Sequence, residues 1–167
     1  MIEFVTGNLL QADTEALVNT VNTVGVMGKG IALQFKERFP ANFKTYEEAC
    51  KKGLVKTGEM LVTREVSLEG GRIIVNFPTK TEWYRKSQYS FIEDGLKDLV
   101  RVIKEYSIKS MALPPLGCGH GGLKWEKVKP LIEKYLGDSP ARILVFEPND
   151  KVKEILQKQE SNKEIKL

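Results

Sequence analysis

Histidine and cysteine are scarce in this chain of 167 residues, which contains one histidine and two cysteines. Cys50 and Cys118 lie far apart and lack the spacing of metal ligands, so we interpret both as reduced thiols of a cytoplasmic protein. No cluster of residue types that bind metals has the spacing of a metal site, and no two carboxylates are spaced as an acid–base couple. The sequence therefore predicts neither a bound metal nor a cofactor.

Long apolar runs are also absent. The start, MIEFVTGNLL, has no basic segment followed by an apolar one, and no later segment is long enough to span a bilayer, so we expect neither a secretory signal nor a membrane partner. The net charge of +4 permits an anionic partner. Much of this excess lies in residues 151–167, which we interpret as a charged tail or the start of a linker after one domain at residues 1–150.

Short β-branched apolar runs alternate with helical patterns, which predicts an α/β sandwich of three layers. Most runs lack strict apolar–polar alternation, as expected for strands that are covered on both faces. The expected strands are residues 2–5, 16–21, 60–63, 72–77, 111–116 and 142–147. The expected helices are one that ends at Pro40, with Ile31, Phe35 and Phe39 on one face, then 42–53, 87–107 with Phe91, Leu96 and Leu99 inward, and 124–137 with a kink or break at Pro130.

Two glycine-rich segments follow expected strands. In GVMGKG, residues 25–30, the glycines lead into a helix N-terminus, whose backbone amides favour an anion. This is not a Walker loop, because Lys29 is followed by Gly30 rather than by Ser or Thr. A tight turn that ends in a glycine cap is the alternative interpretation.

The second segment is GCGHGG, residues 117–122, in which Gly117, Gly119 and Gly122 match the G-x-G-x-x-G pattern. A dinucleotide site is therefore an alternative, although the separation to Glu147 is longer than usual and the remaining chain is too short for the second half of that fold. Two glycine loops at the same sheet edge favour a site in which the loops form two walls around a bound diphosphate.

Two residues of the second loop carry reactive side chains. His120 is surrounded by glycines, and we expect it to contact a ligand. Cys118 nearby allows a Cys–His nucleophile pair, but no orienting Asn or Asp is evident, and a small buried cysteine is the alternative.

Lys80 follows the strand RIIVNFPT on an expected loop, where an ordinary solvated lysine is the alternative to a functional one. The next residues interleave aromatic and basic side chains, a pattern that can stack a base and hold phosphates, or pack on the domain. The candidates for contact with DNA are Trp83, Tyr84 and Arg85.

Residues 6–40, TGNLLQADTEALVNTVNTVGVMGKGIALQFKERFP, and residues 113–133, LPPLGCGHGGLKWEKVKPLIE, resemble the macrodomain family of ADP-ribose-binding modules. The GKGIALQFK and GCG…LKWE segments, with a lysine near position 80, are similar to the branch that hydrolyses ADP-ribosyl bonds. The resemblance extends from Met1 to about Glu147 and implies an α/β/α fold with a central mixed sheet. It also implies removal of ADP-ribose from thymidine in single-stranded DNA, by an antitoxin whose partner toxin is an ADP-ribosyltransferase.

The resemblance also implies a role for individual residues. Asn8 and Leu9 would hold adenine, where Asn8 replaces an Asp that is frequent in the family but can still accept from the adenine amine. Asn22 would contact the distal ribose. The loops around that ribose and the diphosphate would be Gly28, Lys29, Gly30, Ile31, Gly117, Cys118, Gly119, His120, Gly121 and Gly122.

Lys80 matches the lysine that attacks or polarises the anomeric carbon in the hydrolase branch. It would act either as a neutral nucleophile or as a charged group that stabilises the departing base. His120 is the candidate replacement for an Asp that some relatives carry in the second loop. The alternatives are a non-catalytic ADP-ribose reader, an ADP-ribose-1″-phosphate phosphatase and a protein ADP-ribosyl ester hydrolase.

Overall fold

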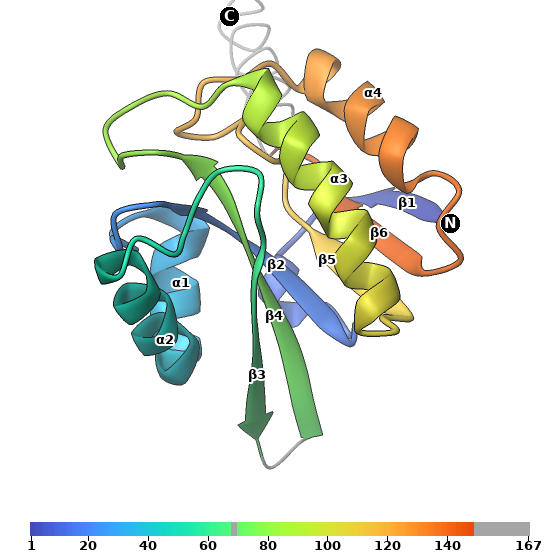
Figure 1. Ribbon diagram of the computed structural model, residues 1–167. Helices are drawn as coiled ribbons and strands as arrows, with labels where there is room; N and C mark the ends of the chain where they lie inside the picture. The colour runs from blue at the N-terminus through green and yellow to red at the C-terminus, as the bar shows by residue number, and fades with distance from the viewer. Residues whose placement is uncertain (68–69, 149–167) are drawn as a thin grey trace, which may run out of the picture.

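The computed structural model describes residues 1–67 and 70–148, so the expected tail and the end of the expected domain at residue 150 lie outside the described residues. Six strands form one sheet (Figure 1). They are β1 (Ile2–Val5), β2 (Ala16–Asn22), β3 (Leu61–Ser67), β4 (Gly70–Lys80), β5 (Ser110–Leu113) and β6 (Arg142–Phe146). The order is β1-β6-β5-β2-β4-β3, and among the described strands only the β3–β4 pair is antiparallel, which confirms the expected mixed sheet.

Four α-helices and one short 3-10 helix connect these strands. They are η1 (Leu9–Gln11), α1 (Gly30–Arg38), α2 (Pro40–Lys51), α3 (Tyr89–Glu105) and α4 (Trp125–Leu136). Pro40 begins α2 instead of only ending the preceding helix, because a proline in the first turn has no N–H that a helical bond would need. The expectation of a break at Pro130 is wrong, since α4 continues through that residue.

Both faces of the sheet are covered, which confirms the three layers. Ala16 and Val18 of β2 belong to the buried cluster that contains the inner faces of α3 and α4. Leu17, between them, belongs to a second cluster with Phe35 of α1. Successive residues of a strand point to opposite faces, so a strand covered on both faces has no need of polar alternation. Figure 1 shows α3 and α4 side by side over one face.

The inner face of α3 differs from the expected one by one position. Ile92 is fully buried, whereas Phe91 is only half-buried. Gly95 lies on the same inner face, and a Cβ on it would be 2.3 Å from Cζ of Phe77 in β4. This glycine therefore permits the close approach of α3 to the sheet.

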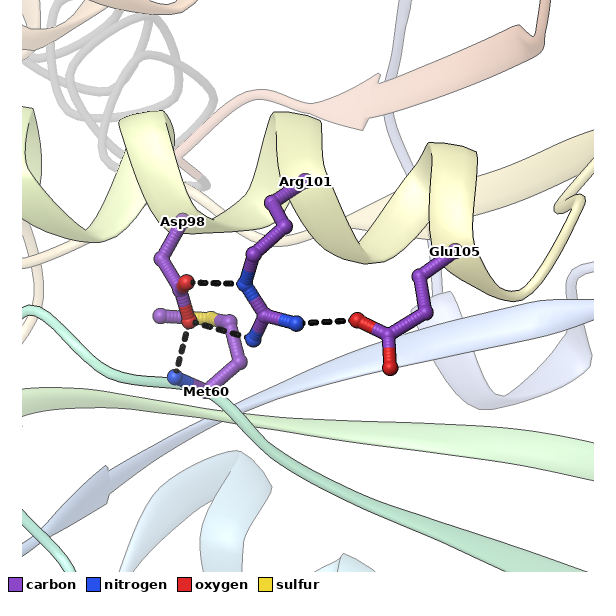
Figure 2. A network of polar contacts seen from close by, with 4 residues as sticks. All are labelled: Met60, Asp98, Arg101 and Glu105. Atoms are coloured by element: carbon purple, nitrogen blue, oxygen red, sulfur yellow. Dashed lines mark hydrogen bonds and ion pairs between the residues drawn. The ribbon is translucent and has the colours of Figure 1, made fainter.

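Asp98 of α3 holds the segment that leads into β3 (Figure 2). Its Oδ2 accepts a hydrogen bond of 2.7 Å from the backbone N–H of Met60, and its Oδ1 accepts one of 2.7 Å from Nε of Arg101, which also pairs with Glu105. Burial alone would raise the pKa of Asp98, but the hydrogen bonds from Arg101 and Met60 and the charge of Arg101 outweigh it and lower the pKa. The carboxylate is thus ionised at neutral pH and fixes the start of β3.

The ends of three adjacent strands differ from the expected ones. β4 extends to Lys80, which was expected on a loop, and Lys80 is in register with Asn22 of β2. β5 ends at Leu113, not Leu116, because the following Pro114 and Pro115 have no N–H for the ladder. In the order β5-β2-β4, these parallel strands bring their carboxyl ends together at one edge of the sheet.

Candidate functional site

A cavity of about 580 Å³ opens at this edge, a volume in the usual range for small-molecule sites. It is lined by eleven of the residues expected at the site, namely Asn22, Gly28, Lys29, Gly30, Ile31, Lys80, Trp83, Gly117, Gly119, His120 and Gly121. Six others do not line it, namely Asn8, Leu9, Tyr84, Arg85, Cys118 and Gly122. The lining also includes residues that sequence reasoning missed, namely Thr20, Val21, Val26, Ala32, Thr79, Pro114 and Pro115.

The two glycine loops approach each other across this cavity. Gly30, at the start of α1, has a φ of +57°, and a Cβ on it would lie 3.9 Å from Cδ2 and Nε2 of His120. The exposed imidazole of His120 therefore lies against the backbone of the first loop. A side chain at position 30 would occupy space beside the imidazole and would require a backbone conformation that favours glycine.

The second loop is folded tightly on itself. A Cβ on Gly121 would lie 2.4 Å from the carbonyl oxygen of Gly117, closer than real atoms approach. The backbone N–H of Leu123 donates to that same oxygen at 2.9 Å. Gly122 does not open a helix, since α4 begins only at Trp125. The G-x-G-x-x-G match thus lacks the strand–turn–helix junction that a dinucleotide fingerprint requires.

Asn22 organises the first loop from the end of β2. Its Oδ1 accepts hydrogen bonds from the backbone N–H groups of Val24, Gly25 and Val26 at 3.1, 3.1 and 3.2 Å. Its Nδ2 donates to the carbonyl oxygen of Val26 at 2.8 Å. One N–H of the side-chain amide remains for a ligand. The sequence offered a signal for this role, because asparagine before a turn commonly bonds to the backbone that follows.

Tyr46 of α2 holds Asn22 through its hydroxyl group. Its hydroxyl oxygen lies 2.8 Å from both the backbone oxygen and Oδ1 of Asn22, so one proton is shared between two acceptors. The side chain is fully buried. Burial, and to a smaller extent the neighbouring Cys50, raises the pKa of Tyr46, so that the hydroxyl remains a donor. Nothing in the sequence pattern linked these residues.

Lys80 extends from the last position of β4, half-buried in the cavity wall. Its Nζ lies 3.5 Å from the carbonyl oxygen of Trp83. Burial, and secondly the charge of Lys29, lowers the pKa of Lys80. Thr81, which follows Lys80, is held by two hydrogen bonds. Its carbonyl oxygen accepts from the N–H and from the hydroxyl of Thr23, at 3.0 and 2.7 Å. The end of β4 thus places an amine whose pKa lies below that of an ordinary lysine.

Three expected site residues have other contacts. Asn8 Oδ1 caps η1 by accepting from the N–H of Leu10 at 3.0 Å, and the side chain of Leu9 is buried in the core. The thiol of Cys118 lies 3.5 Å from the carbonyl oxygen of Leu116 and outside the cavity lining, and the Cys–His nucleophile pair stays a prediction. The assignment of Asn8 and Leu9 to adenine stays a prediction.

The aromatic residues after β4 form a platform at the mouth of the cavity. Trp83 and Tyr84 are in T-shaped contact, with ring centroids 5.3 Å apart, and are 55% and 64% exposed. Arg85 is ion-paired with Glu82. The exposed rings are therefore open to a partner, whereas the guanidinium already has one.

Metal chemistry finds no support in the described part of the chain. No group of three or more His, Cys, Asp and Glu residues there is placed to hold a metal ion. Among the same residues, no helix is both long enough and apolar enough to cross a membrane.

Comparison with known proteins establishes the family. Residues 18–132 match the Macro domain family, so the chain belongs to it. A protein of Mycobacterium tuberculosis (strain ATCC 25618 / H37Rv) named DNA ADP-ribosyl glycohydrolase is 58% identical over 129 residues, which cover 77% of this chain and 37% of that protein. A protein of the same name from Thermus aquaticus is 52% identical over 149 residues, 89% of this chain and 41% of that protein.

Solved structures agree with this assignment. The macrodomain of Mycobacterium tuberculosis DarG superposes with a TM-score of 0.86 at 52% identity, covering 89% of this chain and 98% of that one. Thermosipho africanus DarTG in complex with ADP-ribose superposes with a TM-score of 0.85 at 34% identity, over 89% of this chain and 42% of that one. A Thermosipho africanus protein named as a DNA ADP-ribosyl transferase–glycohydrolase fusion is 37% identical over 90% of this chain and 42% of its own length. The chain thus spans about two fifths of the length of these three curated relatives.

Proposed function

We propose that this chain is the hydrolytic macrodomain of a DNA ADP-ribosyl glycohydrolase, which removes ADP-ribose from thymidine in single-stranded DNA. The observation that carries the proposal is the half-buried Lys80, with its lowered pKa, at the edge where both glycine loops meet. The names of the relatives at 58% and 52% identity support the same reaction. The fused transferase in one relative supports a partner ADP-ribosyltransferase toxin, with this chain as the antitoxin in the cytoplasm.

The cavity suits an ADP-ribosyl group. Backbone amides of both glycine loops and the start of α1 favour the diphosphate, and Lys29 adds a positive charge at the same wall. The remaining N–H of Asn22 is available to a ribose hydroxyl. Binding therefore relies chiefly on main-chain groups, which explains why glycines occupy both loops.

Lys80 then acts as the nucleophile. Its neutral amine forms a bond from Nζ to the anomeric carbon while the bond from that carbon to the thymine imide nitrogen breaks. Thymine takes up the proton that the amine loses. Water next attacks the anomeric carbon as the bond from that carbon to Nζ breaks, one proton of the water passes to Nζ, and free ADP-ribose leaves the regenerated amine of Lys80. His120, whose imidazole lies beside Gly30 in the cavity lining, would move a proton in either step.

The platform of Trp83 and Tyr84 would hold the nucleotides that flank the modified thymidine. Aromatic rings stack on any base, which suits recognition of a single strand with little sequence preference. Arg85 contributes less than the sequence suggested, because Glu82 already neutralises its charge.

The test compares three substrates of the same site. Thymidine-ADP-ribosylated oligonucleotide, ADP-ribose-1″-phosphate and a protein carrying ADP-ribose on a carboxylate are incubated with the protein, and the products are separated chromatographically. The proposal predicts that kcat/KM is highest for the oligonucleotide. A preference for the phosphate or the ester would instead support one of those hydrolases, and tight ADP-ribose binding without any product would indicate a reader. Lys80→Ala should lower the yield of product, and Lys44→Ala, an exposed change on α2, is its matched control.

A further inference from the structure

Residues 83–89 and residues 121–127 lie side by side next to the opening of the cavity. The backbone N–H of Ser87 donates to the carbonyl oxygen of Gly121 at 2.9 Å. Further along, the N–H of Lys124 donates to the hydroxyl of Tyr89 at 3.1 Å. Residues 83–89 and 121–127 thus form one continuous surface, which we call the basic ridge.

Three lysines lie along the basic ridge, and all three are exposed. The aliphatic stem of Lys86 lies over the second glycine loop, with its Cδ 3.4 Å from the position of a Cβ on Gly122. Lys124 precedes α4, and Nζ of Lys127 lies 5.7 Å from the ring centre of Tyr89. The stem of Lys86 thus rests on the protein, and the ammonium group of Lys127 lies near an aromatic ring.

The charges of these lysines are not neutralised in place. Within the described residues, Lys86, Lys124 and Lys127 form no ion pair, whereas neighbouring lysines do, such as Lys129 with Glu147. Glu126 is the one carboxylate inside the two segments of the ridge. The ridge therefore keeps a positive excess that a polyanion can use.

The opposite rim of the cavity has a different character. Val24 and Val26 of the first loop are 49% and 41% exposed. Glu47 of α2 lies behind them, with its Cα 3.8 Å from the position of a Cβ on Gly25. Because Glu47 is itself ion-paired with Lys51 and Lys29 of the same loop is exposed, this rim differs from the basic ridge in its apolar surface rather than in its charge. Cationic side chains hold a phosphate backbone, and exposed valines do not, so the ridge is the more favourable side.

We propose that a single DNA strand leaves the cavity over the basic ridge, with bases on Trp83 and Tyr84 and phosphates on Lys86, Lys124 and Lys127. This inference rests on the proposed function and adds the path of the strand. Because the ridge begins at the ring of Trp83 that lines the cavity, the strand needs no separate binding site. Contacts of this type give affinity that is strongly salt-dependent and indifferent to sequence.

The test variant is the triple change Lys86→Gln, Lys124→Gln and Lys127→Gln. The matched control is Lys44→Gln, Lys52→Gln and Lys104→Gln, which removes the same charge from exposed lysines that form no ion pair with a described residue. Two substrates are used, a ten-nucleotide strand with one ADP-ribosylated thymidine and ADP-ribosyl-thymidine alone. The readout is the ratio of kcat/KM for the strand to that for the nucleoside, measured across salt concentrations.

If the basic ridge binds the strand, the triple variant should lower this ratio about tenfold at low salt. It should also reduce the slope of log(kcat/KM) against log[salt] by about 2, because each phosphate that a lysine no longer neutralises contributes roughly 0.7 to the slope. The control keeps the native ratio and slope. Equal ratios in both variants would overturn the ridge while leaving the hydrolase intact. If the native protein cleaves neither substrate, the proposed function fails, and the salt slope of binding to the labelled strand, measured by fluorescence anisotropy, decides the ridge on its own.

Discussion

The hydrogen bond from Tyr46 to Asn22 gives a stability prediction that follows directly from the geometry. Tyr46→Phe removes the hydroxyl that lies 2.8 Å from Asn22 Oδ1 and leaves the ring in its fully buried place. The backbone oxygen of Asn22 also loses its contact with this hydroxyl, whereas Asn22 Oδ1 keeps its bonds to the N–H groups of Val24, Gly25 and Val26. The cost is therefore that of one ordinary hydrogen bond, about 1 kcal/mol of unfolding free energy.

Urea denaturation followed by circular dichroism measures this change, and thermal unfolding should show a loss of about 2–4 °C in Tm for a domain of this size. Tyr106→Phe is the control, because its half-buried hydroxyl makes no hydrogen bond with a described residue, and we expect a change of less than about 0.5 kcal/mol. Equal effects of the two substitutions would refute the reasoning. They would mean that Asn22 holds the first loop without help from α2.

Three further predictions concern the second loop, the α3 anchor and the lysine. Gly121→Ala places a Cβ 2.4 Å from the carbonyl oxygen of Gly117, so the loop must shift; we expect a loss of about 1–3 kcal/mol and of ADP-ribose binding by calorimetry, and native affinity would contradict the geometry. Asp98→Ala leaves the N–H of Met60 without its acceptor and should cost about 1–2 kcal/mol at pH 7. Because the folded pKa of Asp98 is lowered, this difference should persist above the ordinary aspartate pKa and vanish as pH falls through the folded value; a difference that is constant with pH would be inconsistent with it. Since burial and Lys29 lower the pKa of Lys80, kcat/KM should rise with pH and level off below the usual lysine range, whereas a rate that falls over that range would indicate a protonated lysine.

The order and type of the elements could be predicted from the sequence, because apolar runs and helical periodicity report burial directly. The ends of elements could not. The run that contains Pro114 and Pro115 is apolar throughout, but the missing N–H groups end β5 at Leu113. β4 reaches Lys80 because β2 offers a partner strand that far, and pairing between distant segments leaves no local pattern.

The candidate site could likewise be predicted only in part. Glycine loops at strand ends indicated the cavity, and eleven of the expected residues line it. Asparagine before a turn is a sequence signal for the turn role of Asn22, whereas the particular groups that its amide bonds are determined only by the fold. Tyr46 bonds to Asn22 from α2, and Lys86 lies against Gly122 of the second glycine loop. Both contacts join residues that are far apart in the sequence, so no local pattern indicates them.

Release of ADP-ribose from a thymidine-ADP-ribosylated oligonucleotide, compared between the native protein and Lys80→Ala, tests the central claim most directly. ADP-ribose binding by each protein is measured in parallel by calorimetry, so that a folded site is assured. The account predicts multiple turnover by the native protein and at least a hundredfold lower kcat in Lys80→Ala, in keeping with about 10²- to 10⁴-fold effects of catalytic groups. Equal turnover by the two proteins, or none by either despite tight ADP-ribose binding, would contradict it.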